Sequence, residues 1–281
     1  MILDIPNTRE HASENMAYLL SGKATEEQMI AYLTQRPILE ATADELLGYY
    51  DVVWELRKPG QFPKTDIDIV GTGGVKTPRY NVSTTCCFIL AALGISVAKH
   101  GNRGSRKTNG SFDFLEHLGL SLDHLTERAL ENLDEFNLSF LFAKDWHPIF
   151  KMLAPARAKL AGPTVLNLLG PLLNPAQPKF SMIGVSDIEL APIMADVLLQ
   201  QNRKGWIVAG DGGLDEISTT GDSNIWIINE SITQKTINPS NCNIPLAKPG
   251  SVEGGLAEEN ATIFHELIHA KGQKHIRDLV I

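Results

Sequence analysis

The chain has 281 residues, of which 43% are hydrophobic and 21% are charged, and its formal net charge is −8. This length predicts one large or two modest domains, and the acidic balance argues against a broad nonspecific nucleic-acid surface. The three cysteines follow no disulfide or metal-binding spacing, which favours a reducing compartment. The N-terminus has no secretory-signal pattern, and the longest apolar run, Cys86 to Leu93, is too short for a bilayer. We therefore expect a cytoplasmic protein without a membrane segment.

Residues 1–62 are predicted to form a small helical domain, because apolar residues recur there at helical spacing and strand patterns are scarce. Thr25, followed by Gln28 three positions later, predicts a helix start with a capping box. The proline and glycine cluster at residues 58–63 predicts a hinge. We therefore expect a second, larger α/β domain over residues 63–281, with a later helical segment as a candidate addition to the first domain.

From residue 66 onward, short strand patterns alternate with helical patterns. The expected strands are Ile67–Val70, Ile95–Ala98, Leu138–Phe142, Phe180–Gly184 and Gly205–Ala209, and the expected helices include Thr84–Leu93, Ser111–Leu118 and Ile188–Gln201. This alternation predicts an α/β fold with a mostly parallel sheet. Residues 225–228 and 233–237 are expected to add an antiparallel pair of strands.

Three segments rich in glycine or small polar residues are predicted to lie together at the carboxyl edge of the sheet. They are Gly71-Thr72-Gly73-Gly74, Asn81-Val82-Ser83-Thr84 and Lys99-His100-Gly101-Asn102-Arg103-Gly104. Glycine loops let backbone N–H groups approach an anion, and a helix N-terminus adds a positive dipole. Each segment has a simpler explanation, as a tight turn, helix caps or a solvated basic loop. Together they predict a site for a heavily phosphorylated ligand.

Two adjacent carboxylates, Asp215 and Glu216, follow the last predicted parallel strand and a glycine-rich turn. Such a pair is often only solvated, but beside a phosphate site it favours Mg²⁺ held by carboxylates and ligand phosphates. The hydroxyl of Ser83 is a further candidate ligand. Arg157 either pairs with surface acids or binds a carboxylate. The adjacent Cys86 and Cys87 are more typical of a helix core than of a nucleophile.

Several motifs in fixed order resemble the anthranilate phosphoribosyltransferase family. They read DIVGTGG, NVST, VAKHGNR, LLGPLLNP and GLDEIS, preceded by LLSGKATEEQMIAYL and followed by GGLAEENA, and so cover nearly the whole chain. The resemblance implies a nucleoside phosphorylase-like fold with a small α-domain, a larger α/β domain and a substrate cleft between them, in a homodimer. It also implies Mg²⁺-dependent transfer of the phosphoribosyl group of phosphoribosyl pyrophosphate (PRPP) to the amine of anthranilate, in tryptophan biosynthesis.

The resemblance carries over residue by residue. It implies PRPP binding by Gly71, Gly74, Val75, Arg79, Asn81, Val82, Ser83, Thr84, Lys99, His100, Gly101, Asn102, Arg103, Gly104, Ser105, Arg106, Lys107 and Ser111. It implies metal binding by Ser83, Asp215 and Glu216, and acceptor binding by Gly71, Asn102, His147 and Arg157. No general base is assigned, because an aryl amine is already neutral at physiological pH. Catalysis is then expected to rest on positioning and on stabilisation of the leaving pyrophosphate.

The chain departs from the family pattern in four places. Val75 stands where the family usually has Asp, and Lys76 and Arg79 stand where it has small or uncharged residues. We hypothesise that these two cations take over part of the pyrophosphate contact. The loop after Arg103 is less serine-rich than in the family, Pro163 replaces an arginine on the acceptor side, and the sequence stops where the family continues into further helices.

Two alternatives remain open from the sequence alone. One is a diverged enzyme that uses another acceptor or acts as a nucleoside phosphorylase, although the GTGG and NVST motifs favour the transferase. The other is a non-catalytic paralogue that binds a nucleotide or nucleic acid through its basic loop. The net charge and the Asp215-Glu216 pair argue against this second alternative.

Overall fold

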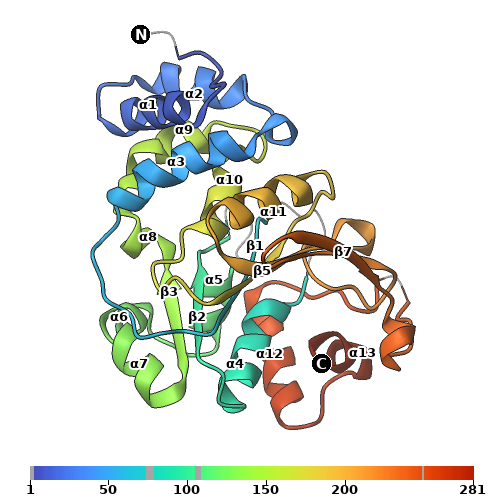
Figure 1. Ribbon diagram of the computed structural model, residues 1–281. Helices are drawn as coiled ribbons and strands as arrows, with labels where there is room; N and C mark the ends of the chain where they lie inside the picture. Colours follow the sequence, from blue (N-terminus) through green and yellow to red (C-terminus); the bar gives the residue numbers. More distant parts are fainter. Residues whose placement is uncertain (1–2, 74–78, 105–108, 249) are drawn as a thin grey trace.

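The computed structural model describes residues 3–73, 79–104, 109–248 and 250–281. Within these residues a seven-stranded sheet has the order β3-β2-β1-β4-β5-β6-β7 (Figure 1). The strands are β1 Ile67–Gly71, β2 Val97–Gly101, β3 Leu138–Phe142, β4 Phe180–Gly184, β5 Lys204–Gly210, β6 Ser223–Ile228 and β7 Ile232–Ile237. The five strands from β3 to β5 in this order run parallel, and β6 and β7 add antiparallel pairings. The mostly parallel α/β fold with an antiparallel addition is confirmed.

One expected strand was misplaced. The pattern predicts a strand over Ile95–Ala98, but β2 starts later and continues to Gly101. Gly94 has a φ of +84° and ends the preceding helix, and the N–H of Ile95 bonds back to that helix at Leu90. Residues 99 and 100 therefore belong to a buried strand rather than to a loop, which corrects the expectation that the basic loop begins at Lys99.

Helices cover the sheet and form a separate layer at one end of the molecule (Figure 1). The α-helices are α1 Arg9–Leu20, α2 Glu26–Thr34, α3 Ala43–Glu55, α4 Val82–Ala92, α5 Ser111–His117, α6 Leu122–Glu127, α7 Ala129–Phe136, α8 Ala143–Trp146, α9 Ala154–Ala158, α10 Leu166–Leu169, α11 Leu190–Gln200, α12 Ala257–Ile268 and α13 Lys274–Val280. Short 3₁₀ turns are η1 Ile38–Glu40, η2 Pro148–Leu153, η3 Gly170–Leu172, η4 Asp211–Gly213 and η5 Pro239–Cys242. No helix in the described part of the chain is long and apolar enough to cross a bilayer.

Helix α1 packs on α3, and α2 joins them through the hydrogen bond from Asn15 to the Tyr32 hydroxyl. From later in the chain, α9 packs on α2 and α10 packs on α3. The expected capping box forms at α2, where Thr25 and Gln28 exchange side-chain and backbone hydrogen bonds. The buried residues of these helices, such as Met16, belong to the same hydrophobic cluster as Ile183 and Ile207 of the sheet. The division into domains at residue 62 stays a prediction.

On the sheet, α4 packs against β1, β2 and β3, and α11 packs against β5, β6 and β7. Cys87 of α4 is fully buried beside Phe112 and Phe140, and Cys86 is half-buried. Burial raises the pKa of Cys86 to about 11 and that of Cys87 to about 12. Thiols that stay protonated suit the core interpretation rather than a nucleophile.

The linker between α3 and β1 is fastened to Trp146, at the end of α8. The N–H of Lys58 donates to the Trp146 carbonyl at 2.8 Å, and the Phe62 ring centre lies 4.9 Å from that of Trp146. A Cβ at Gly60 would lie 2.7 Å from the indole ring, so the glycine permits this close approach. The predicted hinge segment is therefore held by an aromatic anchor to α8, which directly follows β3.

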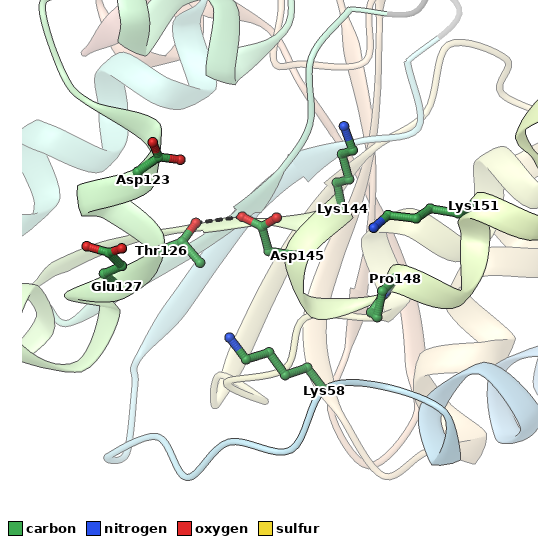
Figure 2. Close-up of a pocket in the computed structure, with 8 residues that line it drawn as sticks. All are labelled: Lys58, Asp123, Thr126, Glu127, Lys144, Asp145, Pro148 and Lys151. Atoms are coloured by element: carbon green, nitrogen blue, oxygen red, sulfur yellow. Dashed lines mark hydrogen bonds between the residues drawn. The ribbon is translucent and has the colours of Figure 1, made fainter.

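Beside this linker lies a polar cavity of about 310 Å³ (Figure 2). Its charged lining consists of Lys58, Lys144 and Lys151 together with Asp123, Glu127 and Asp145. The lining charges balance, and Thr126 donates to Asp145 at 2.7 Å (Figure 2). Among the residues that the structure describes, none of those predicted for PRPP, metal or acceptor binding lines this cavity.

Candidate active site

Asp215 lies against the carboxyl ends of β1 and β4, where two glycines make room for it. Gly71 and Gly184 are paired across these strands. A Cβ at Gly71 would lie 2.3 Å from Asp215 Oδ2, and one at Gly184 would lie 1.6 Å from the Asp215 carbonyl oxygen. The N–H of Gly73 also donates to Asp215 Oδ2 at 3.2 Å. The topology thus brings the first glycine loop and the carboxylate turn together, as the sequence predicts.

The carboxylate pair is largely shielded from solvent and already contacts a cation. The side chains of Asp215 and Glu216 are 12% and 16% exposed, and Arg79 Nη2 lies 2.6 Å from Asp215 Oδ1. Burial raises the pKa of Glu216 to about 7, with Arg79 opposing the rise and the charge of Asp215 adding to it. Adjacent carboxylates that hold a guanidinium form a site of the right charge for a divalent cation.

The donor set fits Mg²⁺, which takes oxygen ligands and is commonly held by one or two carboxylates plus substrate phosphates. In the described part of the chain, no group of three or more His, Cys, Asp or Glu side chains gathers to hold a metal ion. A metal at Asp215 and Glu216 would therefore need further ligands from substrate or water. Ser83 lies in the first turn of α4, with its Oγ 3.4 Å from Lys99 Nζ, and its role as a metal ligand stays a prediction.

Lys99 is buried inside the sheet, with 3% of its surface exposed. Its ammonium group donates to the carbonyl of Ile69 and to Ser83 Oγ. The cation thus crosses from β2 past β1 to the first turn of α4. Its charge therefore lies next to the predicted phosphate loop at Ser83, and it comes from a buried strand and not from a solvated loop.

His100 is also buried and forms part of the sheet's polar interior. Its Nδ1 lies 3.1 Å from the Gly170 carbonyl oxygen, and its N–H donates to Asp68 Oδ1 at 3.3 Å. Asn174 Nδ2 donates to Asp68 Oδ2 and to the Ala98 carbonyl, both at 2.7 Å. The asparagine of the LLGPLLNP motif therefore ties β1 to β2.

The free energy of unfolding is expected to respond to the charge state of His100 in mildly acidic solution. Burial lowers its pKa from 6.5 to about 3, so between these values the unfolded chain takes up a proton that the folded protein does not, and acid favours unfolding. Replacing His100 with Gln should shrink the loss of stability between pH 6.5 and 4.5 by about 2 kcal/mol. Chemical denaturation at a series of pH values measures this difference.

Comparing the His100→Gln variant with the parent separates the contribution of His100 to the pH dependence from the contributions of its neighbours. Burial raises the pKa of Asp68 to about 6, so Asp68 acts in the opposite direction, and burial lowers that of His147 to about 4. Both groups remain in the variant, as does the buried Lys99. Replacing the exposed His117 of α5 with Gln is the matched control. Identical pH dependence of the His100→Gln variant and the parent would contradict the expectation.

The loop after β2 is organised by Asp113, which sequence reasoning did not assign to the site. Asp113 Oδ2 accepts from the N–H groups of Gly104 and Gly110, at 2.8 and 2.9 Å. Arg103 contacts Asp113 at 3.3 Å and Glu116 at 2.6 Å, with nearly half of its side chain exposed. This carboxylate fixes both ends of the loop, whose predicted PRPP residues Ser105, Arg106 and Lys107 lie outside the described residues.

The segment before α4 is anchored by Asn260 of α12. Asn81 stands at the N-cap position, but its side chain makes no capping bond. Its Oδ1 accepts instead from Asn260 Nδ2 at 2.8 Å, which also contacts the Arg79 carbonyl at 2.7 Å and Asn109 Oδ1 at 3.0 Å. Asn260 is fully buried. Its amide thus joins both predicted phosphate loops to the C-terminal helices.

The other predicted residues of the two loops are partly buried in α4 and partly exposed. Val82 and Thr84 lie in the first turn of α4 and are buried. Asn102 is exposed, and its carbonyl oxygen accepts from Ser111 Oγ at 3.3 Å. Gly74, Val75 and Lys76 lie outside the described residues.

Two predicted acceptor residues come from the segment after β3. His147 is 1% exposed, and its Nε2 lies 2.7 Å from the Leu173 carbonyl oxygen. Its ring centre is 5.4 Å from that of His100. Arg157 lies in α9 with its side chain open to solvent. Their roles toward an acceptor stay predictions.

Residues 64–281 match a family model described as the a/b domain of a glycosyl transferase family. The anthranilate phosphoribosyltransferase of Arthrobacter sp. is 37% identical over 262 residues, which cover 93% of this chain and 74% of that protein. The chain belongs to the anthranilate phosphoribosyltransferase family. The family member from Dehalococcoides mccartyi is 35% identical and spans 100% of this chain and 83% of its own length.

Solved structures of anthranilate phosphoribosyltransferases have the same fold. The Thermus thermophilus protein superposes with a TM-score of 0.91 at 32% identity, covering 99% of this chain and 84% of that chain. The Saccharomyces cerevisiae protein, solved in complex with PRPP and Mg, gives a TM-score of 0.84 at 24% identity, covering 97% and 80%. The chain is thus a pentosyltransferase of the glycosyltransferase class with a phosphoribosyltransferase fold.

Proposed function

We propose that this protein transfers the phosphoribosyl group of PRPP to the amine of anthranilate and releases pyrophosphate, as a step of tryptophan biosynthesis. The observation that carries the proposal is the shielded Asp215-Glu216 pair held against the glycine loop at Gly71 and Gly73. Membership of the family favours this transferase over a nucleoside phosphorylase or a non-catalytic nucleic-acid-binding paralogue. The Saccharomyces cerevisiae relative has been solved with PRPP and Mg and with 4-fluoroanthranilate.

The pyrophosphate half of the site is proposed to combine backbone and side-chain groups. The N–H groups of the first turn of α4, which begins at Val82, suit phosphate oxygens because a helix N-terminus carries positive dipole charge. Lys99 adds a buried ammonium group beside Ser83. Asp215 and Glu216 would hold Mg²⁺, which when bound offsets the negative charge of the leaving pyrophosphate. These groups together favour departure of the leaving group rather than attack by an enzyme nucleophile.

The acceptor half is proposed to position anthranilate without a general base. The amine is neutral at physiological pH, so orientation of the attacking nitrogen supplies the main contribution. Arg157 can bind the acceptor carboxylate through two parallel N–H donors. Asn102, His147 and Gly71 are proposed as further contacts, following the family pattern. We also propose a cytoplasmic homodimer; gel filtration with light scattering tests the dimer.

The activity is tested by following anthranilate fluorescence with PRPP and Mg²⁺. We expect a PRPP-dependent loss of signal that stops when the metal is chelated. Parallel measurements of nucleoside phosphorolysis and of salt-dependent DNA binding cover the two alternatives. Absence of anthranilate consumption in a protein that still binds PRPP would reject anthranilate as the acceptor.

A further inference from the structure

Arg79 forms an ion pair at the two carboxylates that are proposed to hold the metal. Its Nη2 lies 2.6 Å from Asp215 Oδ1, and its Nη1 lies 3.9 Å from Glu216 Oε1. The Arg79 side chain is only 16% exposed. Its Nη1 is buried and has no hydrogen-bond partner in the described part of the structure. The guanidinium therefore supplies positive charge at this carboxylate pair, while its own Nη1 donor stays unsatisfied among the described residues.

The backbone of Arg79 is held independently of its side chain. Its carbonyl oxygen accepts from Asn109 Nδ2 at 2.8 Å and from Asn260 Nδ2 at 2.7 Å. Arg79 also forms an antiparallel bridge with Glu253, and a Cβ at Gly254 would lie 2.3 Å from the Arg79 carbonyl carbon. The guanidinium can consequently leave the carboxylates while the backbone keeps its anchors.

We propose that Arg79 is the resident counter-ion of the Asp215-Glu216 pair and that Mg²⁺ can bind this pair only after the guanidinium has left it. This inference rests on the proposed function for the identity of the metal. The oxygen that pairs with Arg79, Asp215 Oδ1, belongs to the carboxylate that the metal requires. Two cations at one shielded carboxylate would repel each other, so each excludes the other.

The exchange has a consequence for the order of binding. Metal alone must displace a paired, poorly solvated guanidinium, and it leaves that group without a partner. PRPP brings phosphate oxygens that bind a guanidinium well and that also complete the ligands of Mg²⁺. Metal binding without PRPP is therefore weak, and metal and PRPP bind cooperatively.

The test measures Mn²⁺ binding to the full chain in the absence of PRPP, by the loss of the free-ion electron paramagnetic resonance signal. We expect the Arg79→Gln variant to bind Mn²⁺ at least about tenfold more tightly than the parent, because the competing charge is gone. Replacing the exposed Arg128 with Gln, which removes the same charge elsewhere, should leave the affinity unchanged. Equal or weaker Mn²⁺ binding by Arg79→Gln would overturn the proposal.

Two further measurements keep the result unambiguous. Arg79→Met also removes the charge and keeps a long side chain, so we expect a similar gain, and if Arg79→Gln fails to fold, unchanged Mn²⁺ affinity of Arg79→Met overturns the proposal. Anthranilate consumption is measured separately on the parent. If Arg79→Gln binds Mn²⁺ more tightly but the parent does not consume anthranilate, the proposed function is rejected and the counter-ion role of Arg79 is kept. If the parent consumes anthranilate but Arg79→Gln binds Mn²⁺ no more tightly, the counter-ion role is rejected and the proposed function is kept.

Discussion

Replacing Asp215 with Asn and Glu216 with Gln in one variant is expected to lower kcat/KM for PRPP by at least about a hundredfold. The two amides keep the shapes of the side chains, so the space opened by Gly71 and Gly184 still accommodates residue 215. What is lost is the negative charge that would hold Mg²⁺. Initial rates of anthranilate consumption over a range of Mg²⁺ concentrations measure the effect.

The matched control makes the same chemical changes on α6, as Asp123→Asn with Glu127→Gln. These acids line the polar cavity of Figure 2 and belong to no part of the proposed site, so activity should be retained. Thermal unfolding of the Asp215→Asn, Glu216→Gln variant checks that the protein stays folded when Arg79 loses its ionic partners. Full Mg²⁺-dependent activity in this variant would show that these two carboxylates do not hold the metal.

Replacing Asn260 with Asp is expected to weaken PRPP binding and to lower the free energy of unfolding by about 2 kcal/mol or more. The new carboxylate would face the Arg79 carbonyl and the oxygens of Asn81 and Asn109, all of which now accept from the Asn260 amide. Loss of these donors frees both phosphate loops from α12. The KM for PRPP and chemical denaturation report the two effects.

Replacing the exposed Asn241 of η5 with Asp introduces the same charge at the surface and serves as the control. Asn260→Ala removes the donors without adding charge, so it separates the loss of the anchor from repulsion. An unchanged KM for PRPP in both Asn260 variants would show that the loops keep their positions without this amide.

Much of the sheet could be predicted from the sequence, because the alternation of apolar strands and amphipathic helices is strong there. Leu138–Phe142 and Phe180–Gly184 are strands with the expected bounds. The error at β2 has a physical cause. Lys99 and His100 are polar enough to indicate a loop, yet groups from distant segments, such as the carbonyls of Ile69 and Gly170, satisfy them inside the fold.

Part of the candidate site could also be predicted from the sequence, because it follows from the parallel arrangement of the strands. The glycine loop follows β1 and the carboxylate turn follows β5, with only β4 between them, so both segments lie at the carboxyl edge of the parallel strands whatever their separation in sequence. The supporting residues could not be assigned in this way, since the anchor Asn260 contacts a backbone oxygen 181 positions earlier. Arg79 likewise suggested an anion beside it, and only the three-dimensional arrangement places a carboxylate there.

The pairing of Gly71 and Gly184 has a consequence for mutational scanning of this protein. Neither glycine has a positive φ, so a methyl group at either position strains no turn and meets Asp215 instead. Alanine at position 71 would displace the Asp215 carboxylate while leaving the strands paired, whereas alanine at position 184 would collide with the Asp215 backbone. Screens that report abundance or solubility would then score the Gly71→Ala variant as tolerated, whereas growth selection without tryptophan would score it as null.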